Sequence, residues 1–313
     1  MRGIFNKLFP SETMGPMFDQ YMRNALLLLM EDSENEPATL VEVPRVFTDA
    51  DWRNKKLARI KNPVVVDFWK QEAAKAGGDA ALANMTPYIT SKFSNFIAND
   101  YVRPIIGQTK SAFRFQEVMD EGKILLVNLS KGKIGDINAN LLGMIVIGKI
   151  LMAAFARADQ EVRKDFHVYV DEFQNFTTDS VSTIFSEARK YRLTMTVAHQ
   201  FIAQLTDPVR DSIFGNVGNQ IAMRVGPSDA DFLVKQFEPT FSTNDLINID
   251  NLFAYVNMMV NGQTTTPFNM EVGKQSWEKG NPEYKNKLKE YARLKYGKPR
   301  HRVEEEIGKR LRG

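Results

Sequence analysis

The 313-residue chain is 43% hydrophobic and 25% charged, which is typical of a folded globular protein, and its length predicts about two domains. It has no cysteine and three histidines, which excludes disulfides, thiolate metal sites and cysteine nucleophiles and argues against a histidine-based metal site. The apolar run Ala25–Met30 is far shorter than the ~20 residues of a membrane span, so we expect no transmembrane helix and no secretory signal.

The first 110 residues are expected to be helical. Apolar periodicity predicts helices over Met17–Met30, 51–60, 63–76 and 79–97, and runs of β-branched residues are scarce. We therefore predict an all-α subdomain over residues 1–110.

Strands and helices alternate after this region. The continuous apolar run Lys123–Leu129 predicts a strand that is buried on both faces. The further elements expected are a helix over 138–157, a strand over 166–170, a helix over 179–191, and strands over 193–198 and 220–225. This order predicts an α/β domain over residues 111–273, with a mostly parallel sheet and helices on both faces. Asn261-Gly262 predicts a two-residue hairpin turn, and therefore an antiparallel edge.

The remaining residues, 274–313, form a basic tail. They contain 13 Lys or Arg and 6 Asp or Glu, although the net charge of the whole chain is only +3. Aromatic residues alternate with these charges, so the tail is suited to nucleic acid or to acidic lipid. The alternative is a solvated terminal helix.

Two adjacent carboxylates, Asp171 and Glu172, follow the apolar strand predicted over 166–170. The carboxyl end of a parallel strand is where ligands bind in open α/β sheets. In a phosphoryl-transfer site, Asp171 would hold Mg²⁺ and Glu172 would orient and deprotonate the attacking water, which is a Walker B pattern. The alternative is a strand end that carries two solvated acids.

Four further side chains are candidates for the same chemistry. Gln200 ends the next strand, where its amide can hydrogen-bond a γ-phosphate or the attacking water. Arg189 and Arg192 lie at the basic end of the intervening helix, and Arg224 ends a later strand. A favourable helix-dipole interaction explains the first two arginines equally well, and a strand-end salt bridge explains the third.

The series of motifs resembles a known family. Asp171–Phe176, Ser186–Tyr191 and Ala198–Gln200 resemble the type IV secretion and conjugative DNA-transfer ATPases, the TraG/TraD-type coupling proteins of the HerA–FtsK superfamily. The resemblance implies a RecA-like P-loop NTPase core that forms hexamers, uses ATP and Mg²⁺, and moves single-stranded DNA through a central pore. It also implies membrane-associated secretion machinery as a partner, and a cytoplasmic location at the inner face of the membrane.

Roles for individual residues follow from the same resemblance. It implies that Asp171 binds Mg²⁺, directly or through water, that Glu172 is the general base and that Gln200 senses the γ-phosphate. Arg189 would stabilise charge, also across a subunit boundary. Arg192 and Arg224 would contact the nucleotide or a neighbouring subunit.

The chain departs from the family at the phosphate-binding loop. Gly143–Ile150 has the spacing of glycines and lysine, but it has Ile150 where the Mg²⁺-binding hydroxyl belongs and it falls within a predicted helix. Gly107–Ser111 has a Lys-Ser pair without a glycine-rich loop. We therefore expect the C-terminal part of a motor whose N-terminal P-loop segment is a separate partner, and no appreciable ATPase activity from this chain alone. The alternatives are a catalytically incomplete DNA-binding or oligomerisation module and a HerA-like repair translocase.

Overall fold

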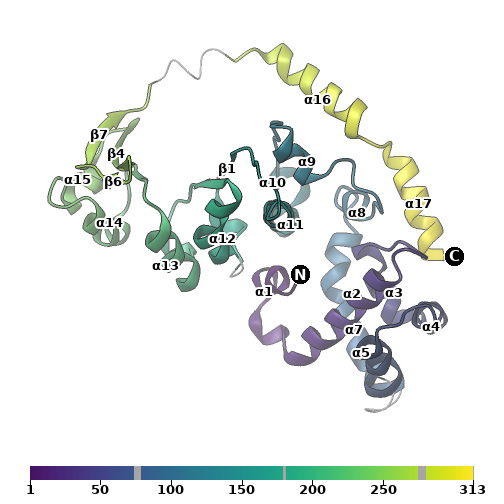
Figure 1. The fold of residues 1–313 in the computed structure, drawn as a ribbon. Coiled ribbons are helices and arrows are strands. Elements are labelled where there is room, and N and C mark those ends of the chain that lie inside the picture. Colours follow the sequence, from purple (N-terminus) through teal and green to yellow (C-terminus); the bar gives the residue numbers. More distant parts are fainter. Residues whose placement is uncertain (74–78, 179–180, 274–279, 313) are drawn as a thin grey trace. The chain divides into compact units, whose positions relative to one another are not determined.

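The computed structural model describes residues 1–73, 79–178, 181–273 and 280–312 (Figure 1). The chain divides into two compact units. Unit 1 comprises Met1–Arg114, Leu125–Ile145 and Tyr291–Gly313, and unit 2 comprises Phe115–Ile124 and Val146–Glu290.

The described part of unit 1 contains helices and no strand. Its α-helices are α1 (Arg2–Leu8), α2 (Pro16–Glu31), α3 (Val43–Thr48), α4 (Ala50–Leu57), α5 (Pro63–Asp67), α7 (Asp79–Ile97), α8 (Arg103–Ile106), α10 (Lys131–Ile134), the first half of α11 (Asp136–Phe155), the end of α16 (Pro282–Tyr296) and α17 (Arg300–Arg312). A π-helical stretch, η3 (Phe68–Glu72), follows α5, and the predicted end of that helix lies outside the described residues.

Local signals explain where several of these helices begin. Asp49 and Asn62 cap α4 and α5 by accepting hydrogen bonds from the backbone N–H groups of Trp52 and Val64. The core that these helices enclose is aromatic. Phe5, Phe18, Phe93 and Phe96 are each about 1% exposed, and the last three rings pack around that of Phe5.

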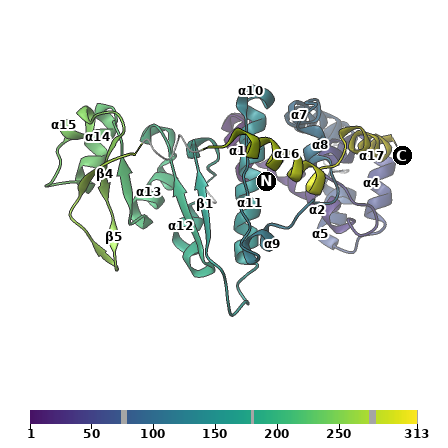
Figure 2. The same cartoon turned by 90° about the horizontal axis from the view of Figure 1, so that it is seen from above.

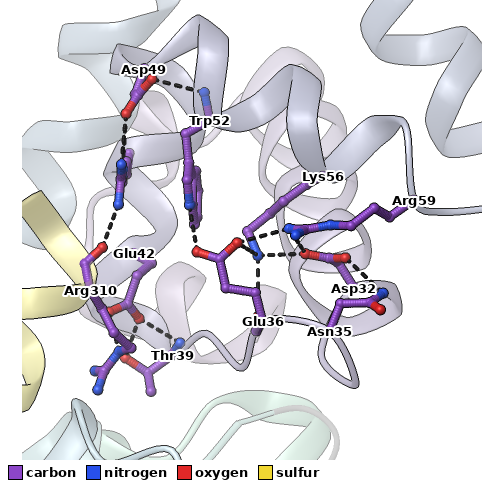
Figure 3. Close-up of polar contacts among 11 residues, drawn as sticks. Asp32, Asn35, Glu36, Thr39, Glu42, Asp49, Trp52, Lys56, Arg59 and Arg310 are labelled. Atoms are coloured by element: carbon purple, nitrogen blue, oxygen red, sulfur yellow. Dashed lines mark hydrogen bonds and ion pairs between the residues drawn. The ribbon is translucent and has the colours of Figure 1, made fainter. Parts of the chain in front are cut away.

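A buried ion cluster joins α2 to α4 (Figure 3). The Lys56 ammonium lies 2.7 Å from the Asp32 carboxylate, and both side chains are fully buried. Arg59 also binds Asp32, at 2.6 Å, and Glu36 accepts a hydrogen bond from the Trp52 indole at 2.7 Å. Because the charges are paired and hydrogen-bonded, their burial is tolerated, but loss of one partner would leave an uncompensated charge.

Helix α17 packs against the N-terminal helices of unit 1. Val303 and Ile307, one turn apart, are each 2% exposed and contact Val41, Ile97 and Ile106. The Arg310 guanidinium donates to Glu42 at 2.9 Å, and the Arg103 guanidinium donates to both oxygens of Glu304 at 2.9 and 3.0 Å. The last part of the chain therefore belongs to unit 1, which differs from the separate tail expected over 274–313. The predicted boundary itself adjoins residues 274–279, which lie outside the described part.

Unit 2 contains every strand that the structure describes. Its helices are α9 (Phe115–Asp120), the second half of α11, α12 (Ser182–Glu187), α13 (Asp207–Asn216), α14 (Pro227–Leu233), α15 (Thr243–Asn248) and the start of α16, with the 3₁₀ turns η4 (Phe173–Asn175) and η6 (Ala188–Tyr191). Its strands are β1 (Phe166–Val170), β2 (Leu193–Val197), β3 (Gln220–Ala222), β4 (Phe253–Asn257), β5 (Met259–Val260), β6 (Gln263–Thr264) and β7 (Phe268–Glu271).

The strands form three sheets. β1 and β2 pair in parallel, with Phe166 opposite Leu193 and Val170 opposite Val197. β3, β4 and β7 form an antiparallel sheet, so the strand expected over 220–225 is not part of the parallel sheet as predicted. β5 and β6 form the expected hairpin, which extends from the end of β4 (Figure 2), and Asn261 and Gly262 both have positive φ, as a type I′ turn requires.

The strand expected over Lys123–Leu129 is not present. These residues have no regular secondary structure, and the side chains of Ile124 and Leu126 are 89% and 82% exposed. An apolar run becomes a buried strand only where neighbouring strands pair with it, and none of the described strands does so.

Helix α11 contains Gly143–Ile150, which is therefore helical and not a phosphate-binding loop. By length and composition alone, α11 is also apolar enough to cross a membrane, contrary to the expectation from the sequence. More than half of its most apolar window is buried within the protein, and the core helix of a globular domain passes the same test.

Candidate functional site

The parallel pairing of β1 and β2 brings their carboxyl ends to the same edge. The backbone N–H of Ala198 donates to Val170 O at 2.9 Å, and the N–H of Phe173 donates to Ala198 O at 2.9 Å. The residues after each strand are Asp171-Glu172 and His199-Gln200. The structure therefore brings together the two carboxylates and the glutamine that the sequence singled out.

The Glu172 carboxylate is held between two amides. Gln200 Nε2 donates to Glu172 Oε1 at 2.6 Å, and Gln174 Nε2 donates to Glu172 Oε2 at 2.7 Å. Gln200 is exposed, whereas Gln174 is only 7% exposed and comes from η4. Hydrogen bonds to an ionised carboxylate are among the stronger ones, so these two amides fix the orientation of the Glu172 side chain.

Glu172 has an unusual backbone conformation. Its φ of 51° lies in the left-handed region, which a residue with a side chain adopts at a cost of roughly 1–3 kcal/mol. The next residue, Phe173, is fully buried and keeps the chain in this turn. Strain of this kind, held in place by packing, is concentrated at functional sites.

Asp171 is exposed beside this carboxylate. Its Oδ1 accepts a hydrogen bond from the backbone N–H of Glu172 at 3.0 Å. Mg²⁺ is bound by oxygen ligands, usually one or two carboxylates together with substrate phosphates and water. An exposed carboxylate at the strand end fits that requirement, whereas no cluster of three or more potential metal ligands occurs among the described residues.

His199 lies between Ala198 and Gln200 and faces a different partner. Burial lowers the pKa of His199, and the neighbouring carboxylate of Asp229 opposes this effect in part. Asp229 is 8% exposed, and its Oδ1 accepts a hydrogen bond from the N–H of Ile202 at 3.3 Å. Asp229 therefore holds the loop after β2, which carries Gln200.

The predicted arginines do not join the carboxylates within this chain. Arg189 and Arg192 precede β2, whose five residues span about 16 Å, so they lie at the opposite end of the strand from Gln200. Arg192 forms an exposed ion pair with Asp165 at 3.5 Å. Arg224 donates to Ile249 O at 3.0 Å and to Asn251 Oδ1 at 2.6 Å, so it bridges to the loop before β4.

Gln174 was missed by the sequence analysis. The sequence does contain one indication of its role: Gln174 lies two residues after Glu172 and begins the polar pair Gln174-Asn175, which follows the buried Phe173. Its Oε1 is buried and has no hydrogen-bond partner among the described residues, although its amide nitrogen binds Glu172. Buried polar atoms are normally paired, so this oxygen is an open acceptor beside the carboxylates.

The segment that contains this site matches a known family model. Residues 165–236 match the family model described as the TraM recognition site of TraD and TraG. This segment resembles the corresponding part of TraD and TraG. The match includes β1, β2 and the residues that follow each strand, and it confirms the resemblance to the TraG/TraD-type coupling proteins. A sequence comparison with curated proteins found no match.

Solved structures of the coupling protein TrwB have a similar fold. The unbound monoclinic form of the bacterial conjugative coupling protein TrwBΔN70 matches with 12% identity and a TM-score of 0.58, over 87% of this chain and 68% of the TrwBΔN70 chain. TrwB with the GTP analogue GDPNP matches with 13% identity and a TM-score of 0.57, over 87% and 68% of the two chains. TrwB with ADP and Mg²⁺ matches with 13% identity and a TM-score of 0.58, over 87% and 67%. These TM-scores show a similar fold, which supports the α/β architecture expected from the sequence.

Proposed function

We propose that this chain is part of the ATP-driven DNA-translocating motor of conjugation or type IV secretion. In this proposal it forms hexamers with a RecA-like core, and single-stranded DNA passes through the central pore. The observation that carries the proposal is the Glu172 carboxylate, which two amides hold at the shared carboxyl edge of β1 and β2. The edge lies within the segment that matches the TraD/TraG family model.

In this proposal, each residue at this edge has a separate role in nucleotide hydrolysis. Mg²⁺ bound with ATP would neutralise phosphate charge, and Asp171 is the side chain that would hold it. Glu172 would orient and deprotonate the attacking water, while Gln200 and Gln174 keep its carboxylate in place. Gln200 is thus engaged with Glu172, which makes it a positioning residue as well as a sensor of the γ-phosphate.

The proposal keeps a role in hydrolysis for one of the three arginines. Arg189 is exposed and forms no ion pair with other described residues, so it is available to act across a subunit boundary. Arg192 and Arg224 are engaged with Asp165 and with the loop before β4, so we assign them no nucleotide contact.

The phosphate cradle is proposed to come from a separate P-loop segment. The one stretch with the glycine and lysine spacing lies inside α11, where backbone N–H groups are already used in the helix. The full chain alone is therefore expected to release no appreciable phosphate from ATP, with or without single-stranded DNA. Robust turnover that disappears in Glu172→Gln would show that the chain holds its own cradle.

DNA transfer in cells tests the role of Glu172. Cells would express Glu172→Gln in place of the wild-type chain, and the frequency of DNA transfer would be measured. Loss of a general base typically lowers a rate by ~10²–10⁴, so transfer should fall steeply. Glu161→Gln is the matched control, because Glu161 is an exposed carboxylate that precedes β1. Equal transfer by the two variants would contradict the proposal.

We also propose a protein partner within the transfer machinery. The matched family model is described as a TraM recognition site, so residues 165–236 are the segment expected to contact a TraM-like protein. The motor would then work at the inner face of the membrane, beside the secretion machinery. A catalytically incomplete module or a HerA-like repair translocase would use the same fold without this partner.

A further inference from the structure

Helix α16 exposes an apolar stripe. Every side chain from Pro282 to Lys295 is exposed. Tyr284, Leu288 and Tyr291 are 65%, 57% and 57% exposed, and their spacing of four and three residues puts them on one face of the helix. Leu294, which is 76% exposed, lies three residues after Tyr291 and extends this face by about one turn along the helix. An apolar face that no part of a chain covers is costly in water, and such faces mark interaction surfaces.

Cations surround the stripe. The helix contains Lys285, Lys287, Lys289, Arg293 and Lys295 but only two acids, Glu283 and Glu290. At 100° per residue, Lys285 and Lys287 lie on either side of the line through Tyr284, Leu288 and Tyr291. Lys285, Lys289 and Arg293 form no ion pair with other described residues, so their charges are available to an anionic partner.

One end of the helix is fixed to unit 1. The Tyr296 ring packs edge-on against Phe113, with ring centroids 5.9 Å apart. α17 begins four residues after Tyr296 and is held by the ion pair between Arg310 and the buried carboxylate of Glu42. The stripe is therefore carried by a helix whose C-terminal end is anchored to unit 1 and whose side chains from Pro282 to Lys295 are exposed.

We propose that α16 lies on the surface of an anionic lipid bilayer. A stripe of leucine and tyrosine flanked by lysines is the pattern of helices that bind in the plane of the membrane interface, with the apolar side chains inserted and the cations at the headgroups. A nucleic-acid backbone would use the cations but would leave Leu288 and Leu294 in water. The inference rests on α16 alone and does not depend on the nucleotide chemistry of unit 2.

Vesicle co-sedimentation of the full chain tests this proposal. The probes are vesicles of phosphatidylcholine and vesicles that also contain phosphatidylglycerol. The wild type is expected to bind only the anionic vesicles, with an affinity that falls as salt is raised. Leu288→Gln combined with Tyr291→Gln is expected to weaken binding about tenfold or more without changing the charge. Asn286→Gln on the opposite face is the matched control and should bind as the wild type does.

Three results would overturn the proposal. The first is a wild type that does not bind anionic vesicles. The second is an Asn286→Gln control that loses as much binding as the double variant. The third is a double variant that loses affinity for a single-stranded oligonucleotide but keeps its vesicle binding, which would assign α16 to nucleic acid. Circular dichroism of each variant verifies that the helix content is unchanged, so a loss of binding reports on the surface.

Discussion

Arg310→Met removes the charge that compensates a buried carboxylate while it keeps most of the aliphatic stem. Glu42 is 1% exposed, and its two oxygens have different partners. Thr39 donates to Oε2 through its backbone N–H and its hydroxyl, at 2.6 and 2.7 Å, whereas Arg310 donates to Oε1 at 2.9 Å (Figure 3). The variant leaves Oε1 without this donor and the carboxylate without its cation.

The expected cost follows from burial. Breaking a fully buried ion pair by removing one partner costs about 3–5 kcal/mol. The Arg310 side chain is 19% exposed, so water compensates in part, and we expect the free energy of unfolding to fall by about 2–4 kcal/mol. Adding Glu42→Gln to Arg310→Met removes the buried charge, so the double variant should regain at least ~1 kcal/mol over the single variant.

Urea unfolding followed by tryptophan fluorescence measures this effect. Trp52 and Trp69 are about 5% exposed and belong to unit 1, so they report on its unfolding. Trp277→Phe in every variant removes the third tryptophan from the signal. Arg312→Met, an exposed arginine in the last turn of the same helix, is the control. A cost for Arg310→Met within ~0.5 kcal/mol of the control would refute the reasoning.

Three further predictions concern other parts of the chain. Glu172→Gly should be more stable than Glu172→Ala by ~1 kcal/mol in urea unfolding, because only glycine adopts the positive φ freely; the opposite order would contradict the strain. The pKa of His199 is lowered by burial, so the unfolded chain binds the proton more tightly and stability should fall as pH drops below about 6.5. His199→Gln should lose less free energy of unfolding than the wild type between neutral and mildly acidic pH. Identical pH profiles for the two proteins would contradict the role given to His199. Lys56→Met should destabilise by ~3 kcal/mol, since Asp32 then keeps the Arg59 guanidinium and the Asn35 amide but loses its buried cation; a thermal midpoint equal to that of the wild type would be inconsistent with the buried pair.

The edge that carries the carboxylates was predictable because its signals are local. Short apolar runs end at Asp171 and at His199, and parallel pairing then places both ends together. The turn at Asn261-Gly262 was predictable for the same reason, because a type I′ turn needs residues that accept positive φ.

Features that depend on distant residues, or on the exact path of a turn, were not predictable in this way. The run Lys123–Leu129 has the composition of a buried strand, but composition does not say whether a neighbouring strand is there to pair with it. The amide of Gln174 reaches Glu172 only because η4 turns the chain back. The docking of α17 depends on two apolar side chains, Val303 and Ile307, within a strongly basic stretch whose average composition suggests a solvated tail.

The docking of α17 also constrains how unit 1 is made. The bond from Arg310 to Glu42 joins residues 268 positions apart, and the bonds from Arg103 to Glu304 join residues 201 apart. During synthesis, residues 1–114 leave the ribosome long before α17 has been made, so Val41 and Ile106 lack the cover of Val303 and Ile307 until α17 emerges. Unit 1 therefore completes its fold only after the intervening residues of unit 2 have been made, and a variant that lacks α17 would expose this apolar surface to chaperones and proteases.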